Sequence, residues 1–209
     1  MIAETGIGEA GYRLFYCSRT APHEPRKSTN GASMSENALK ARTVAASQSE
    51  MTEIVLPNDT NLLGHLLGGR LMHFIDLTGA LAAYRHARTP VVTASMDHID
   101  FIRPVRLGDI LTLKASINRA FAHSLEAGVK VWAEHTLTGE VVHVASAYLV
   151  FVAVDTKGHA QPVPELLAET PDELRRYADA LRRREHRESE LTRRRQEAAA
   201  LSASLHGKK

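Results

Sequence analysis

The chain has little cysteine, no long apolar run and no clustered metal-binding pattern. Cys17 is the single cysteine among 209 residues, which excludes an intrachain disulfide and favours a reducing, cytoplasmic compartment. No apolar run approaches the roughly 20 residues that cross a bilayer, so we expect no membrane contact. Because CxxC pairs and His/Cys clusters are missing, we expect no bound metal. Nucleotide-binding glycine motifs are missing too, and no nucleotide energy source is implied.

Positive charge is concentrated at the C-terminal end. The net charge is +2, and it divides into +1 for residues 1–50, −3 for residues 51–170 and +4 for residues 171–209. The basic character therefore comes from the tail and says little about the partners of the central part. The sequence predicts three zones, a leader (1–50), a globular domain (51–165) and a charged helix with a tail (166–209).

The leader is predicted to be disordered, because it is rich in small and polar residues and has no hydrophobic period. Scattered arginines are typical of a transit peptide, but the glutamates among them argue against one. Met34 is an alternative start, and the sequence leaves open whether residues 1–33 belong to the native protein.

The central zone alternates between one helical pattern and several strand patterns. A helix is predicted from Gly68-Gly69 to about His86, apolar almost all round and therefore buried. Period-two patterns and short turns predict an antiparallel meander after it. The expected fold class is α+β, an antiparallel sheet wrapped around a long central helix. The predicted strands are residues 51–56, 91–101, 109–119, 124–135 and 141–154.

Asp76 interrupts the apolar helix. A buried carboxylate costs several kcal/mol unless it is paired or hydrogen-bonded. Asp76 therefore either has a structural partner or is kept for chemistry. It follows Gly69 by seven residues, about two helical turns, so the two lie on nearly the same helix face.

Residues 171–205 are predicted to form a charged helix that begins at Thr170-Pro171. Arginines and acids recur there at spacings of three and four residues, which favours a solvated helix laced with ion pairs. Packing on a neighbouring subunit is compatible with this pattern. A nucleic-acid or membrane contact is the less favoured alternative.

Five segments together resemble the hotdog-fold acyl-CoA thioesterases, specifically the cytosolic acyl-CoA hydrolase group. They are PNDTN (57–61), GHLLGGRLMHFID (64–76), PVVTASMDHIDFIRPVRLGD (90–109), HSLEAGVKVWAE (123–134) and SAYLVFVAVD (146–155). The resemblance implies hydrolysis of fatty acyl-CoA to free acid and CoA, with no cofactor because CoA is part of the substrate. It also implies a homo-oligomer, a double-hotdog dimer that assembles into a hexamer or tetramer.

The resemblance assigns catalytic roles to three residues. Asp76 would be the general base or nucleophile, Asn61 would come from the partner subunit, and Gly69 would donate to the oxyanion. The residue-level alternatives are a satisfied buried carboxylate for Asp76 and a loop cap for Asn61. His65 and His73 are weaker candidates for a base.

The resemblance assigns CoA binding to Gly68, Arg103 and Ser124, and a basic group such as Arg103 would meet the CoA phosphates. A solvated surface role is the alternative for Arg103 and Ser124. The alternative function is a non-catalytic hotdog module that binds acyl-CoA as a sensor or serves in assembly.

Overall fold

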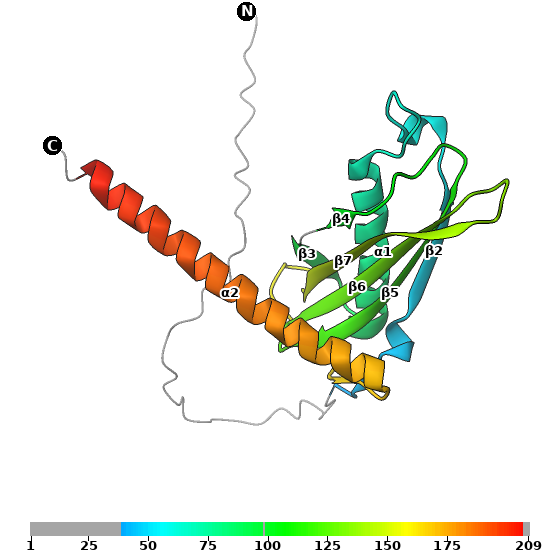
Figure 1. Cartoon of the computed structure of the whole chain (residues 1–209). Coiled ribbons are helices and arrows are strands. Elements are labelled where there is room, and N and C mark those ends of the chain that lie inside the picture. The colour runs from blue at the N-terminus through cyan, green and yellow to red at the C-terminus, as the bar shows by residue number, and fades with distance from the viewer. Residues whose placement is uncertain (1–38, 98, 207–209) are drawn as a thin grey trace, which may run out of the picture. The chain divides into compact units, whose positions relative to one another are not determined.

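The computed structural model describes residues 39–97 and 99–206 (Figure 1). The predicted leader up to residue 38 lies outside the described residues. The described chain already forms strand β1 (Arg42–Thr43) and a 3₁₀ turn, η1 (Ala45–Ser47). Val44 and Ser47 are buried there. The folded domain therefore begins before residue 51, the boundary that the sequence predicted.

One long helix, α1 (Gly68–Ala87), lies against a curved antiparallel sheet, as Figure 1 shows. Short β4 (Asp100–Phe101) also pairs with β7. This confirms the predicted α+β arrangement. In spatial order the strands of the sheet are β2 (Ser49–Ile54), β5 (Ile110–Ala120), β6 (Ser124–Glu134), β7 (Val141–Ala153) and β3 (Val91–Met96).

The strand that follows α1 does not open a sequential meander. The prediction of one strand over residues 91–101 was wrong, because the segment divides into β3 and β4. Strand β3 lies at the sheet edge beside β7, the last strand of the set, and not beside β5. The reason is that short turns join β5, β6 and β7 side by side, and β2 pairs with the other edge of β5. The free pairing edge for the strand that leaves α1 is therefore on β7.

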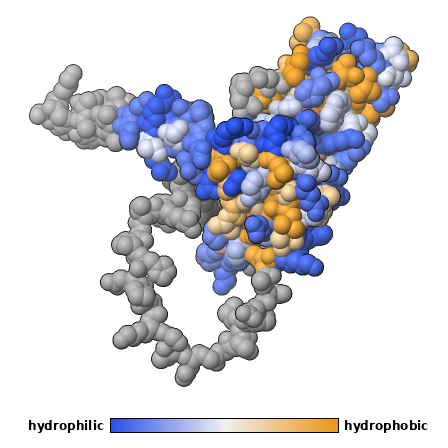
Figure 2. Space-filling model, turned by 60° about the horizontal axis from the view of Figure 1, so that its bottom comes forward, coloured by the Kyte–Doolittle hydropathy of each residue, from blue (hydrophilic) through white to orange (hydrophobic). Residues whose placement is uncertain are grey.

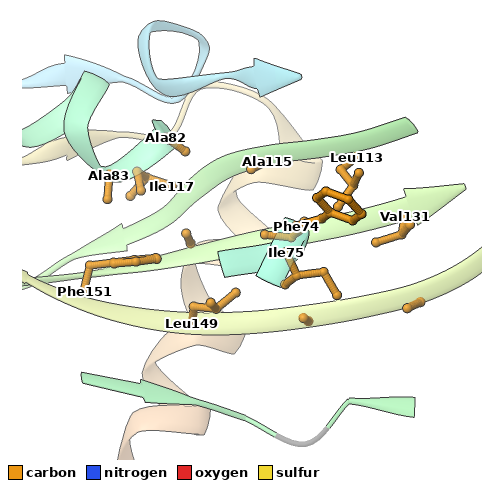
Figure 3. Packing of buried hydrophobic residues seen from close by; sticks show 14 of the residues in the cluster. Phe74, Ile75, Ala82, Ala83, Leu113, Ala115, Ile117, Val131, Leu149 and Phe151 are labelled. Carbon is orange, nitrogen blue, oxygen red and sulfur yellow. The ribbon is translucent and has the colours of Figure 1, made fainter. Parts of the chain in front are cut away.

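The core fills the space between α1 and the inner face of the sheet (Figure 3). Alternate residues of the long strands point inward, so Leu113 and Leu149 are fully buried. Ile75 of α1 meets them, and burial of each such side chain stabilises the fold by about 1.5–3 kcal/mol. Gly79 lets the helix approach closely, since a Cβ there would lie 3.2 Å from the Phe151 ring.

The C-terminal helix α2 (Pro171–His206) begins after β8 (Leu166–Leu167), which pairs in parallel with β1. Its start is a capping box. The Thr170 N–H donates to Glu173 Oε2 at 3.0 Å, and the Glu173 N–H donates to Thr170 Oγ1 at 3.3 Å. The predicted helix start is confirmed.

Ion pairs at helical spacing run along α2. Figure 2 shows that the coloured part of this helix that projects beyond the sheet is mostly hydrophilic. The pairs include Arg175–Asp172, Arg182–Asp179, Arg184–Glu188 and Arg193–Glu190. The helix is not simply solvated, however. Its first half packs on the outer face of its own sheet, where Arg183 reaches the fully buried Glu126. None of the described helices is long and apolar enough to cross a membrane.

Candidate functional site

The loop between β2 and α1 leaves the start of the helix open. Buried Asp59 forms an ion pair with Arg70, with 2.9 Å between Oδ1 and Nε, and its carbonyl accepts the Leu67 N–H. The helix then begins at Gly68 with no side-chain cap. The N–H groups of Gly68 and Gly69 have no acceptor among the described residues. Together with the helix dipole they form an electropositive end that suits an oxyanion.

Asn61 caps this loop. Its Oδ1 accepts the N–H groups of Leu63 at 2.9 Å and His65 at 3.1 Å. The loop-cap alternative for Asn61 is therefore observed, because an Asn side chain readily bonds its own backbone in turns. Its Nδ2 amide has no partner among the described residues and stays free to donate. Asn61 makes no hydrogen bond with Asp76 within the described chain.

Asp76 has one partner. The Thr93 hydroxyl of β3 donates to Asp76 Oδ1 at 2.8 Å, and Oδ2 makes no bond to another described residue. The sequence did not single out Thr93. The sequence offered only a slight indication of this role for Thr93, a hydroxyl within an otherwise apolar strand. It did not show that this strand packs beside α1.

The surface around Asp76 is not buried within one chain. Leu77, Leu81 and Tyr84 lie on one side of α1 by their spacing, and each is 42–45% exposed. Val92 of β3 is half exposed as well. We call these four residues the open face. The prediction that α1 is buried all round was wrong for the described chain, because nothing within it covers this side. Asp76 is accordingly only partly buried.

Arg103 lines two cavities of about 300 Å³ each. The first adjoins the start of α1 and is lined by Gly68, His65 and Leu71 among others. The second is more polar and includes Arg106. The structure thus brings Arg103 and Gly68 to one cavity. Neither cavity is lined by Asp76 or Asn61.

Ser124 lies elsewhere. It opens β6 on the same face as Glu126, which is the outer face under α2 and not the inner face against α1. Its assignment to CoA stays a prediction. His73 is exposed on α1, and His65 lines the first cavity. Among residues 39–97 and 99–206, no group of three or more His, Cys, Asp or Glu side chains is arranged to hold a metal ion.

The model of the thioesterase superfamily matches residues 63–140. The chain is 38% identical over 154 residues to YkhA of Bacillus subtilis, an uncharacterized acyl-CoA thioester hydrolase, covering 74% of this chain and 87% of that protein. It is 34% identical over 139 residues to the human cytosolic acyl coenzyme A thioester hydrolase. That match covers 66% of this chain and 37% of the longer human protein.

Two solved structures show the same architecture. A hexameric acyl-CoA thioesterase superposes with a TM-score of 0.70 at 38% identity, covering 73% of this chain and 97% of that one. An acyl-CoA hydrolase from Staphylococcus aureus, solved with butyryl-CoA and CoA, superposes with a TM-score of 0.71 at 33% identity, covering 78% and 99%. Three further structures of that hydrolase are single mutants, in which alanine replaces an asparagine, an aspartate or a threonine.

Proposed function

Because the chain belongs to the thioesterase superfamily, and to its acyl-CoA thioester hydrolases, we propose that it cleaves the thioester of a fatty acyl-CoA into free acid and CoA. The observation that carries the proposal at the residue level is the Thr93 hydrogen bond to Asp76. It ties up one carboxylate oxygen and leaves the other free. A carboxylate held in this way can take a proton from water or attack the thioester carbonyl itself.

The spacing of three residues supports this assignment. In the Staphylococcus aureus hydrolase, the asparagine, aspartate and threonine replaced by alanine are separated by 15 and 17 residues in that enzyme's numbering. The same intervals separate Asn61, Asp76 and Thr93. We therefore assign catalytic roles to these three residues, with Thr93 holding the carboxylate of Asp76 in place.

The open start of α1 would stabilise the negative charge that develops on the thioester oxygen. We assign the oxyanion donor to the Gly69 N–H, with Gly68 beside it. Removal of a single side-chain donor from an enzyme oxyanion hole costs about 2.7–4 kcal/mol, and a well-aimed backbone N–H would act on the oxyanion in the same way. Arg103, which lines the cavity next to Gly68, is our candidate for the CoA phosphates.

A second copy of the chain would complete the site. Asn61 and Asp76 make no hydrogen bond with each other among the described residues, and the described residues leave the apolar open face beside Asp76 exposed. We propose that the partner subunit covers this face and brings its own Asn61 amide toward the water or thioester at Asp76. A related thioesterase is hexameric, which supports a homo-oligomer of such dimers. A cytoplasmic location is proposed by analogy with the cytosolic human relative.

Thiol release from acyl-CoAs of increasing chain length tests the proposal. We expect Asp76→Asn to lower kcat at least about 100-fold, since a positioned base or nucleophile contributes that much or more. Asp155→Asn serves as the matched control, because the Asp155 side chain contacts only its own exposed turn, the N–H groups of Lys157 and His159 and the His159 ring. Full turnover by Asp76→Asn would refute the assignment. Wild-type protein that binds acyl-CoA without hydrolysing any chain length would instead be the sensor or assembly module.

A further inference from the structure

A buried carboxylate fixes α2 to the outer face of the sheet. The Glu126 side chain is fully buried, and Arg183 approaches it with Nη2 2.6 Å from Oε1. Arg187 Nη2 lies 3.4 Å from Oε2, and Asn118 Nδ2 lies 3.3 Å from Oε1. Both cations come from α2. Because an uncompensated buried charge is strongly unfavourable, the helix is held at this point of the sheet.

The same helix also forms an ion pair with a second carboxylate, Asp97, at the end of β3. Arg187 Nη1 lies 2.6 Å from Asp97 Oδ2, and both side chains are only about one fifth exposed, at 21% and 19%. Asp97 directly follows β3, and its N–H donates to the Tyr148 carbonyl at 2.9 Å. Arg183 stacks on the Tyr148 ring at 3.6 Å. The end of β3 is therefore fastened to α2 through Arg187.

Strand β3 is an edge strand of the described chain. Among the described residues it pairs only with β7, and its register shifts between Thr93 and Ser95. A bulge of this kind interrupts the ladder and redirects the neighbouring side chain. Thr93 stands immediately before the bulge and donates to Asp76. The direction of its hydroxyl therefore depends on where the strand beyond the bulge is held, and Asp97 is the first charged anchor there.

We propose that the Arg187–Asp97 ion pair is a positioning device, which lets α2 hold the bulged edge strand so that the Thr93 hydroxyl stays on Asp76. Its catalytic consequence rests on the proposed function. Arg187 and Asp97 touch neither substrate nor reacting atoms and act through Thr93. The C-terminal helix, which carries no residue of the assigned site, thereby contributes to the order of that site.

The first test separates kcat from KM. Asp97→Asn keeps the side-chain shape, and Arg187 retains Glu126, so the fold should persist. We expect kcat to fall about tenfold while KM stays within about twofold, because misplaced reacting groups slow chemistry more than binding. Asp97→Glu should recover most of the loss. Glu188→Gln, which removes an ion pair on the same helix away from β3, is the control and should match wild type.

A double variant tests the route through Thr93. In a Thr93→Val background, Asp97→Asn should lower kcat no further, because residues that act through one bond are not additive. A full tenfold loss on top of Thr93→Val would overturn the proposal, as would unchanged kcat in Asp97→Asn alone.

Amide hydrogen exchange tests the anchor without any turnover. We expect the β3 amides to exchange about tenfold faster in Asp97→Asn than in wild type, and to be unchanged in Glu188→Gln. Unaltered exchange in Asp97→Asn would overturn the inference even if the enzyme is an active thioesterase. If wild type hydrolyses no acyl-CoA, the proposed function fails, and the exchange result still decides whether α2 orders β3.

Discussion

Replacement of Arg183 by methionine should destabilise the domain far more than the same change one residue earlier. Arg183 is the main partner of Glu126, whose side chain has no exposed area, whereas Arg182 is 75% exposed and pairs with Asp179 on the same helix. Arg183→Met leaves a carboxylate in the protein interior with its best cation gone. Arg182→Met leaves Asp179 with its second cation, Arg175, whose Nη1 lies 3.2 Å from Asp179 Oδ2.

The expected size follows from what remains around Glu126. Loss of one partner of a buried ion pair costs about 3–5 kcal/mol. Arg187 at 3.4 Å and the Asn118 amide at 3.3 Å still partly compensate the charge, so we expect the lower end, about 3 kcal/mol. With a urea dependence of about 2 kcal/mol per molar, the unfolding midpoint would move down by about 1.5 M.

Urea unfolding followed by circular dichroism, at one fixed protein concentration, measures this shift. The concentration must be constant because an oligomer gains stability by mass action. The midpoint of Arg182→Met should stay close to that of wild type. A double variant, Glu126→Met with Arg183→Met, should recover at least half of the loss, since it removes the stranded charge. The reasoning is refuted if Arg183→Met shifts the midpoint no further than Arg182→Met does.

Three further outcomes are expected. Burial lowers the pKa of His86, whose neutral ring donates from Nε2 to the Pro164 carbonyl at 2.9 Å, so protonation favours the unfolded chain. The free energy of unfolding should therefore fall as the pH drops from about 6.5 toward the lower folded-state pKa, and urea titrations of His86→Gln should show a flatter dependence. Gly79→Ala should lower Tm, because its Cβ would lie 3.2 Å from the fully buried Phe151 ring, and an overpacking cost of about 1–3 kcal/mol exceeds the gain of about 0.5–1 kcal/mol from replacing a mid-helix glycine; an unchanged or higher Tm in a calorimetric scan would contradict the close packing. Leu81→Glu on the open face should yield smaller particles in sedimentation and lose turnover in parallel, whereas an intact, active oligomer would show that this face is not the subunit contact.

Much of the fold could be predicted because strand alternation and helix-capping residues depend only on neighbours along the chain. The alternation along residues 109–119 and 124–135 reports which side chains face the core, and β5 and β6 follow it closely. The capping box at Thr170 marks the start of α2. Asp76 could be singled out because a carboxylate in an apolar helix has to be explained by a partner or by chemistry.

The edge position of β3 could not be read from the sequence. Its pattern is that of any short strand, and the pairing edge was decided by which strands had already joined through short turns. The hydrogen bond of Thr93 depends on that choice, because only pairing with β7 and packing beside α1 put its hydroxyl 2.8 Å from Asp76.

The buried ion cluster was equally hidden. Glu126 alternates correctly as an outward residue, and outward residues of a sheet are normally in water. Glu126 is buried only because α2 packs over it. There Arg183 and Arg187 pair with Glu126, whereas most other charges of α2 pair with each other along the helix surface. By itself the sequence determined the central helix, the long strands with their inward faces and the carboxylate of the candidate site, since these depend on neighbours along the chain. The edge strand, the threonine and the anchored helix were decided by tertiary structure, since each depends on contacts between residues 17 to 90 positions apart.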